Sequence, residues 1–351
     1  MGDETPNLLA ERPAQLLNRS LLGLSLNRLL TVGVFAAMFA IFSIFANNFF
    51  TVRSVLNLLV QTSTFTLLGI GETLVLVVGC VDFSVGAVIA LSGTAVLMFA
   101  RMGMPIWLAM IAACMVCGLV GLANGFMVAK VRLPSFIITF AMAMVIPGFS
   151  MAIRTFLGAL AGPALHPENL EHIGDLANNP AFAIYSQDAS GAEIVVFPGI
   201  SWIVIIMVVV AVLSHLFLTK TRFGRHAFLV GNNPMASLLS GIKVVRIKIL
   251  AFVLTSMLAG LTGVLLASRM GGPPGGAAGY EMIAIECAMI GGASLSGGAG
   301  SVGGAVLGSF LISTLTMGLT MMGANQISLP TLLNGLILIV VVYLDHIRNR
   351  K

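Results

Sequence analysis

Acidic side chains inside long apolar runs are the residues of this chain best placed to do chemistry. The candidates are Glu72, Asp82, Glu281 and Glu286. An ionised carboxylate in a membrane span costs about 2.5 to 3.5 kcal/mol on insertion scales, so each one needs a compensating role. Asp82 and Glu281 stand near predicted helix ends, where a carboxylate can cap the helix. Glu72 and Glu286 lie deeper, which is compatible either with a water-filled path or with hydrogen bonds between helices.

The sequence lacks the residue spacing that a phosphate-binding site, a catalytic nucleophile or a metal site would require. No glycine-rich loop ends in Gly-Lys-Ser or Gly-Lys-Thr, so the chain has no ATP site of that type. An intramembrane serine protease would need a serine close to a histidine. The candidate pairs are Ser92 or Ser296 with His215, and their spacing does not support such a site. The four cysteines have no nearby histidine or second cysteine pair that would complete a metal site. We therefore predict that the chain is not an enzyme, with no catalytic residue, no metal ligand and no bound cofactor.

Composition places the chain in a membrane. Of its 351 residues, 58% are hydrophobic and only 9% are charged, whereas soluble domains carry roughly 25% charged residues. The mean hydropathy is +1.03. The net charge of +5 comes from basic residues at the ends of apolar runs, which is typical of orientation determinants and not of a nucleic-acid surface. We predict an all-α integral membrane protein that contacts lipid and binds no nucleic acid.

Ten apolar runs are candidates for membrane spans of roughly 20 residues. They cover residues 29–46, 56–78, 84–100, 105–128, 134–154, 199–218, 249–268, 281–294, 302–322 and 329–344. An even number of spans puts both termini on one side, and the basic connections lie on that same side, which favours the cytoplasm. We predict about ten transmembrane helices, some short or broken, with both termini cytoplasmic.

The predicted divisions are a cytoplasmic N-terminal tail (1–28), a transmembrane domain (29–347) and a cytoplasmic C-terminal tail (348–351). Two long connections interrupt the domain. The connection 219–248 carries six Lys or Arg and no acid, and a turn signal at Asn233 and Pro234 precedes a short segment that favours a helix. It is predicted to be a cytoplasmic contact surface. The connection 157–198 has acids but no Lys or Arg and is predicted to be external.

Four arginines stand alone in external connections of this topology: Arg53, Arg101, Arg154 and Arg269. A single arginine at a helix end commonly anchors that end at the lipid headgroups. The same residues could instead contact an acidic partner protein. The sequence leaves both interpretations open.

Two polar octets break the apolar pattern. They are residues 79–86 (GCVDFSVG) and 291–298 (GGASLSGG), which share glycine at both ends and serine at the sixth place, with Asp82 opposite Ser294. They resemble a diverged internal repeat. Irregular membrane segments often build transport sites, so the segments 79–86 and 291–304 are candidates for re-entrant structure. The predicted path residues are Glu72, Asp82, Asn124 and Glu286.

Several segments, in order along the chain, carry a family resemblance. They are the octet 79–86, Asn124-Gly125 followed by 132–137 (RLPSFI), 221–225 (TRFGR), 231–242 (GNNPMASLLSGI), and 279–281 with the octet 291–298. From about residue 50 to its end, the chain resembles the permease subunits of bacterial ABC importers for ribose and related sugars, including galactoside, xylose, arabinose and autoinducer permeases. Met235 and Leu238 depart from the family pattern, which usually has a glutamate and a basic residue there.

The resemblance implies a multi-pass permease subunit of the bacterial inner membrane that translocates a sugar or sugar-like solute by alternating access. Its implied partners are an ABC ATPase subunit that holds ATP and Mg, a periplasmic or lipid-anchored substrate-binding protein, and a second permease copy or paralogue. It implies a coupling contact with the ATPase at Asn232, Pro234, Ala236, Ser237, Ser240 and Gly241. The four external arginines would then meet carboxylates on the binding protein.

Two other transport classes are alternatives. An ion-coupled secondary transporter of a small polar solute would also use broken helices and buried acids, but it would need no ATPase and no basic contact segment. A passive channel would need a ring of pore-lining polar residues, and no such pattern is evident. Co-purification of an ATPase would separate the importer from both.

Overall fold

The computed structural model describes residues 26–161, 174, 180–187, 193–272, 274, 277–323 and 329–349. Almost all of the predicted tail 1–28, much of the predicted external connection 157–198, and residues 350–351 lie outside these ranges. The helices are α2 (Leu26–Phe45), α3 (Val52–Val77), α4 (Val85–Arg101), α5 (Ile106–Ala129), α6 (Ser135–Ala161), α8 (Trp202–Lys220), α9 (Arg222–Asn232), α10 (Pro234–Leu239), α11 (Val244–Met270), α12 (Tyr280–Ile290), α13 (Val302–Met321) and α14 (Leu329–Asn349).

Within the described residues, seven helices are long and apolar enough to cross a membrane, which makes this a multi-pass membrane protein. They are α3, α5, the first 18 residues of α6, α8, α11, α13 and most of α14. Residues 31–45 of α2 and the whole of α4 are shorter apolar helices. The predicted span 281–294 is different, because α12 has 11 residues and reaches about 16 Å, roughly half of a hydrocarbon core.

Helix α3 is the centre of the bundle. Every residue from Thr62 to Val77 is buried, and the helix packs against α8, α11, α12 and α13. Helix α11 in turn packs against α4 and α5. The polar residues of α3 from Thr62 onward therefore face protein, whereas most residues of the more peripheral α5, α8 and α14 are not fully buried. This distribution is expected in a membrane, where polar side chains are directed into the bundle.

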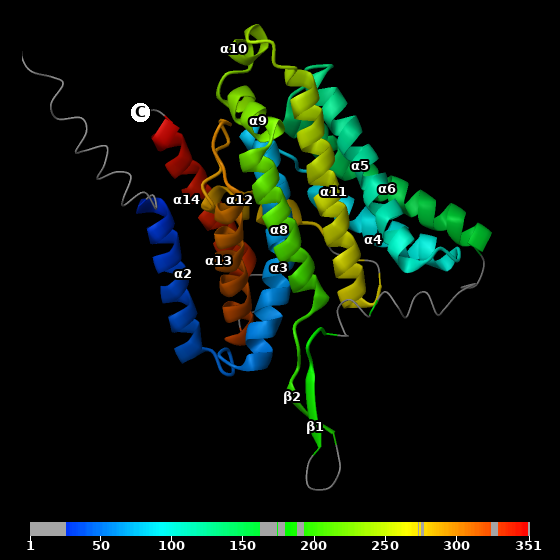
Figure 1. Ribbon diagram of the computed structural model, residues 1–351, viewed down its shortest axis with the longest axis vertical. Helices are drawn as coiled ribbons and strands as arrows, with labels where there is room; N and C mark the ends of the chain where they lie inside the picture. The colour runs from blue at the N-terminus through cyan, green and yellow to red at the C-terminus, as the bar shows by residue number, and fades with distance from the viewer. Residues whose placement is uncertain are drawn as a thin grey trace, which may run out of the picture.

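The connections give the molecule two distinct ends (Figure 1). The short helices α9 and α10 lie at the upper end, together with the start of α2 and the end of α14. We call this the α10 end. At the opposite end, the strands β1 (Ile184–Gln187) and β2 (Glu193–Phe197) form an antiparallel hairpin that projects beyond the helices. The helical class predicted from the sequence is confirmed, and this hairpin in the connection 157–198 is an addition that the prediction lacked.

Close helix packing depends on glycine at a few positions. A Cβ at Gly263 of α11 would collide with the carbonyl oxygen of Ile89 in α4, and the hydroxyl of Ser92 in α4 donates to the Gly260 carbonyl oxygen at 2.6 Å. By contrast, a Cβ at Gly335 of α14 would meet nothing within 4 Å.

We expect Gly263→Ala to destabilise the protein by about 1 to 3 kcal/mol, because α4 and α11 would have to separate. Gly335→Ala is the matched control and should melt like the original protein. Thermal unfolding of both purified variants in detergent checks the prediction. Equal melting temperatures for the two variants would contradict the proposed packing.

Candidate functional site

Two irregular segments lie between helices, residues 78–84 after α3 and residues 291–301 after α12. Both helices end in the same way. The N–H groups of Gly79 and Cys80 donate to the carbonyl oxygens of Leu76 and Val75 at 2.9 and 3.0 Å. Gly292 and Ala293 repeat this pattern with Met289 and Ala288 at 2.8 and 2.9 Å. Gly79 and Gly292 have φ of 73° and 92°, which glycine adopts without strain.

The predicted equivalence of Asp82 and Ser294 has a structural counterpart. The Ser84 N–H donates to Asp82 Oδ1 at 2.8 Å, and the Ser296 N–H donates to Ser294 Oγ at 3.2 Å. In each segment, a side-chain oxygen thus accepts from the backbone two residues later. The two octets therefore share local structure as well as residue types.

Glu72, Asp82, Ser84 and Asn124 form a hydrogen-bonded group that we call the Asp82 cluster. The Asp82 N–H donates to Glu72 Oε1 at 3.1 Å. The Ser84 hydroxyl donates to Asp82 Oδ1 at 2.5 Å and accepts from Asn124 Nδ2 at 2.9 Å. All four residues are fully buried. The cluster therefore ties the first irregular segment to α3 and α5.

All four predicted path residues carry a buried oxygen without a partner. Among the described residues, Glu72 Oε2, Asp82 Oδ2, Asn124 Oδ1 and Glu286 Oε2 have no hydrogen-bond partner. A buried polar atom left unpaired costs about 1 to 3 kcal/mol, so these oxygens are suited to hold water or a polar solute. The structure brings Glu72, Asp82 and Asn124 together, but no hydrogen bond joins Glu286 on α12 to them.

Two further acids have structural hydrogen bonds, one at a helix end and one in the second irregular segment. Glu281 Oε1 accepts from the Gly279 N–H at 3.0 Å, so it stabilises the start of α12 as predicted. Asp345 on α14 was not predicted to have a role. Its Oδ2 accepts from Ser294 Oγ at 3.0 Å and from the Leu295 N–H at 3.2 Å, which holds the second irregular segment. An aspartate within the last apolar helix, where carboxylates are costly, was the signal that could have revealed it.

The end of α9 meets both the end of α3 and the second irregular segment at a point that we call the glycine junction, formed by Val77, Gly231, Asn232 and Gly298. The Gly298 N–H donates to the Val77 carbonyl oxygen at 3.0 Å. A Cβ on Gly231 would collide with that same oxygen, and one on Gly298 would collide with the side chain of Asn232. Three backbones are therefore in direct contact here.

Helix α10 leaves the glycine junction and stands at the surface. Asn233 caps it by accepting from the Ala236 N–H at 2.9 Å, and Pro234 is its first residue. Of the predicted coupling residues, Asn232, Pro234, Ala236, Ser240 and Gly241 are exposed, whereas Ser237 is buried. The sequence prediction omitted the bulky side chains: Leu239 is 84% exposed, Met235 67% and Leu238 56%. Exposed apolar residues on such a short helix indicate a protein contact.

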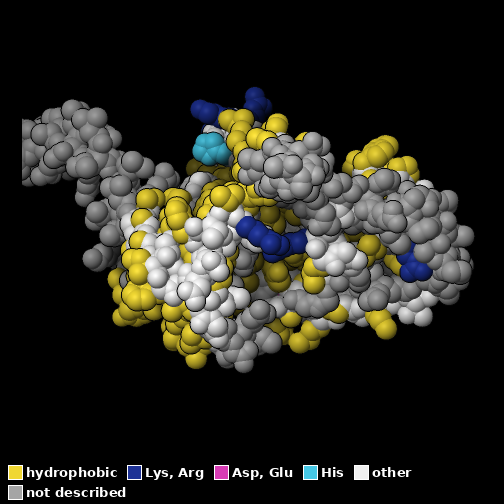
Figure 2. Space-filling view, turned by 90° about the horizontal axis from the view of Figure 1, so that it is seen from below, with side chains coloured by type: hydrophobic (Ala, Val, Ile, Leu, Met, Phe, Trp, Pro, Cys, Tyr) yellow, Lys and Arg dark blue, Asp and Glu magenta, His cyan; other side chains and the backbone are white. Residues whose placement is uncertain are grey.

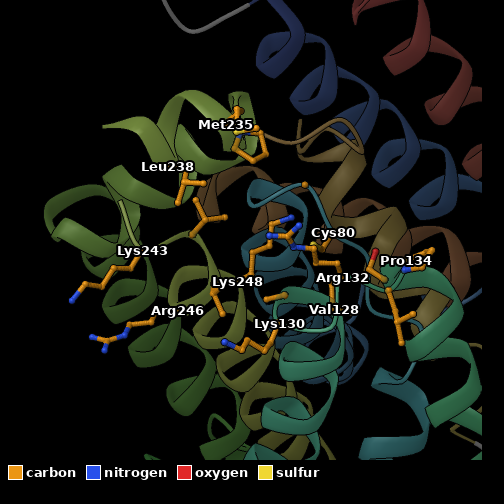
Figure 3. A pocket seen from close by; sticks show the side chains of 17 residues that line it. Cys80, Val128, Lys130, Arg132, Pro134, Met235, Leu238, Lys243, Arg246 and Lys248 are labelled. Carbon is orange, nitrogen blue, oxygen red and sulfur yellow. The ribbon is translucent and has the colours of Figure 1, made fainter. Parts of the chain in front are cut away.

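A cavity of about 900 Å3 lies beside α10, between the α5–α6 turn and the start of α11 (Figure 3). Its lining includes Pro234, Met235 and Leu238 of α10 and several basic side chains, but no Asp or Glu. In the described part of the chain, no group of three or more His, Cys, Asp or Glu is placed to hold a metal ion.

The single arginines lie at the end opposite α10. Arg53 and Arg269 are exposed, and Arg101 is partly buried at the end of α4. The side chain of Arg154 lies outside the described residues. Figure 2, viewed from this end, shows separate basic side chains among hydrophobic and uncharged groups, and no acidic side chain is visible in the coloured part. That this end faces the outside of the cell stays a prediction.

We expect Asp82→Ala to lower the free energy of unfolding by about 1 to 3 kcal/mol, because two buried donors of Ser84 would lose their acceptor. Asp82→Asn keeps Oδ1 as an acceptor and should lose clearly less. Chemical denaturation of both variants in the same detergent measures the difference. An alanine variant as stable as the asparagine variant would contradict the role given to Oδ1.

Comparisons with known proteins show the family of this chain. A family model described as "Branched-chain amino acid transport system / permease component" matches residues 54–342. A ribose import permease protein of Bacillus subtilis is 32% identical over 319 residues, which cover 90% of this chain and 92% of the relative. The L-arabinose ABC transporter permease protein of Azospirillum brasilense is 29% identical over 330 residues, covering 93% and 90% of the two chains.

A xylose transport system permease protein of Haemophilus influenzae is 29% identical over 361 aligned positions, which cover 90% of this chain and 95% of the relative. No solved structure matches the chain. The family match spans most of the chain, including both irregular segments and α10. This protein therefore belongs to the family of branched-chain amino acid transport system permease components.

Proposed function

We propose that this chain is the membrane-spanning permease subunit of an ATP-driven importer of a sugar or sugar-like solute in the bacterial inner membrane. The single observation that carries the proposal is the surface helix α10, which exposes Met235, Leu238 and Leu239 and is joined through the glycine junction to both irregular segments. The ribose, arabinose and xylose permeases named above support the class of solute.

The proposed topology puts the α10 end in the cytoplasm. Lys130, Arg132, Lys220, Lys243 and Lys248 lie in or next to the connections at this end, which agrees with the excess of basic residues in cytoplasmic loops. Ten membrane segments follow if α2, α4 and α12 are counted with the seven long helices. Helix α12 then covers half of the membrane and residues 291–301 complete its passage. Both tails, 1–28 and 348–351, are cytoplasmic in this arrangement, and 29–347 is the permease domain.

In this proposal, the energy of ATP hydrolysis reaches the permease through α10. The chain has no phosphate-binding loop of its own, so ATP and Mg would be held by a partner ATPase subunit. We assign the contact to the exposed face of α10, which combines Met235, Leu238 and Leu239 with the predicted Pro234, Ala236, Ser240 and Gly241. Asn232 acts one step further in, because its side chain lies against Gly298. Ser237 is buried and fastens α10 to the body of the protein.

Movement of α10 is relayed inwards along two backbones. The close contacts of Gly231 with Val77 and Gly298 leave no space to absorb a displacement, so α9 moves the end of α3 and the segment 291–301 together. Immediately after Val77, the chain enters the segment that holds Asp82. We propose that this motion opens and closes a path lined by Glu72, Asp82, Asn124 and Glu286, whose unpaired oxygens can accept hydrogen bonds from sugar hydroxyls.

The outer face would receive a substrate-binding protein, periplasmic or lipid-anchored. Arg53, Arg101, Arg154 and Arg269 are proposed to meet carboxylates on it, which would guide the encounter more than it would strengthen the complex. The hairpin of β1 and β2 projects from the same end and is a further contact element. A second permease, either another copy or a paralogue, completes the proposed assembly.

Reconstitution tests the whole proposal. With its ATPase and binding protein in lipid vesicles, the chain should take up ribose, arabinose or xylose only when ATP is supplied, and vanadate should stop the uptake. Omitting the ATPase is the control. Uptake driven by a proton or sodium gradient without ATP would instead establish the ion-coupled alternative.

Substitution on α10 tests the coupling contact. We expect Leu239→Asp to weaken ATPase binding by about thirtyfold, because placing a charge in an apolar interface costs about 2 kcal/mol or more. Leu239→Met preserves an apolar side chain and should bind normally.

Gly241→Asp should also uncouple hydrolysis from uptake, since Gly241 has φ of 80° and a side chain there is strained. Unchanged pull-down of the ATPase and unchanged solute-stimulated hydrolysis would remove α10 from the coupling contact.

A further inference from the structure

The cavity beside α10 concentrates positive charge that the described protein does not balance. Five cationic side chains contribute to its lining: Lys130, Arg132, Lys243, Arg246 and Lys248. The lining contains no acidic residue, and none of the five forms an ion pair with a described carboxylate. Like charges gathered around one space repel one another unless an anion is bound between them. The cavity is therefore suited to a negatively charged ligand.

One of the five cationic residues has a strained backbone conformation. Arg132 has φ of 67°, in the left-handed region that residues other than glycine, asparagine and aspartate seldom adopt. It lies in the short turn between the end of α5 and Pro134, and Lys248 on α11 lies beside the Cys80 thiol. In Figure 3 the side chains of Arg132 and Lys248 are directed towards Cys80, whereas Lys243 and Arg246 extend away from it. Arg132 and Lys248 are thus the pair best placed to hold one anionic group.

The rest of the lining selects the kind of anion. Apolar side chains of Val128, Leu133 and Val244 share the cavity with the cations. Val128 and Val244 stand at the ends of the apolar helices α5 and α11, and Leu133 lies in the turn before α6. The ends of apolar spans are expected at the level where a membrane meets water. Basic pockets between membrane helices at this level suit the headgroups of anionic lipids. The geometry points to a binding site for the phosphate headgroup of an anionic membrane phospholipid, with its acyl chains along the apolar wall.

This lipid site would act on coupling, because Pro234, Met235 and Leu238 of α10 line the same cavity. A bound headgroup lies against the helix that is proposed to receive the ATPase, so anionic lipid would set the position of α10. That consequence rests on the proposed function. Lipid binding does not, since every contact belongs to this chain alone.

Native mass spectrometry of the purified permease tests the binding. After exchange into detergent with equal phosphatidylglycerol and phosphatidylcholine, the protein should retain phosphatidylglycerol preferentially. The double variant Arg132→Gln with Lys248→Gln should lose about twenty-five-fold in phosphatidylglycerol affinity, because each basic residue near an anionic lipid surface contributes a factor of about five. Raising the salt concentration should weaken retention in the original protein.

Two further variants make the result specific. Arg222→Gln with Arg225→Gln removes the same charge from α9 on the same end of the molecule, outside the cavity lining, and should retain phosphatidylglycerol. Arg132→Lys with Lys248→Arg keeps both charges and should also retain it. Elution as a single peak in size-exclusion chromatography shows that each variant is folded.

Three outcomes would overturn the site. They are equal retention of both lipids by the original protein, equal phosphatidylglycerol loss in the α9 variant, or full retention by the cavity double variant. Displacement of the lipid by millimolar inorganic phosphate would overturn the lipid assignment and leave a soluble phosphate as the ligand. Import is measured separately in vesicles with and without phosphatidylglycerol. Failure of import with intact lipid retention refutes the proposed function, not the site.

Discussion

In an apolar environment, backbone N–H and C=O groups that lie outside a helix must form hydrogen bonds within the protein. The rest of this structure depends on that constraint. The segment after α3 meets it with side chains from three helices. Glu72 of α3 accepts from the Asp82 N–H, and Ser135 and Thr139 of α6 accept from the N–H groups of Val81 and Phe83 at 3.3 and 3.0 Å. Asn124 of α5 completes the set through Ser84. Any motion of this segment therefore moves α3, α5 and α6.

The second irregular segment solves the same problem with fewer side chains and closer backbones. Asp345 accepts hydrogen bonds from Ser294 and Leu295 of this segment, and close backbone contacts at glycine residues hold the remainder in place. A Cβ on Gly291 would collide with the backbone of Gly304, just as one on Gly231 would collide with Val77. Such contacts transmit displacement because packed backbones cannot be compressed. They give the surface helix α10 a short mechanical connection to the centre of the bundle, which is what an externally powered transporter requires.

The two ends of the molecule differ in charge for related reasons. At the α10 end, basic residues surround the cavity between α5, α10 and α11, and in our proposal they also determine the orientation of the chain in the membrane. At the other end, basic side chains are few and separate, among hydrophobic and uncharged groups (Figure 2). In our proposals one end receives the ATPase and an anionic lipid, and the other receives the binding protein. In these proposals the coupling helix and the lipid cavity are neighbours, so bound anionic lipid would influence energy transfer.

The sequence by itself determined the class of fold, the approximate limits of most apolar helices and the family, and it singled out four polar residues inside apolar runs as candidates for a path. Those features follow from local composition, from the length that a span requires, and from the cost of a polar group in an apolar run. The similarity of the two octets was also visible, because turn geometry depends on glycine and on short polar side chains.

Only the tertiary structure decided which of these residues meet. It joined Glu72, Asp82 and Asn124 and left Glu286 apart, revealed Asp345 as an anchor, and shortened the predicted span 281–294 to the helix α12. It also buried Ser237, which was predicted to belong to the contact surface, and placed Leu238 and Leu239 on the exposed face of α10. These outcomes depend on contacts between residues far apart in the chain, and on which side of a six-residue helix packs against the protein. Neither is set by residue type alone, since a short helix has too few turns to show an apolar period.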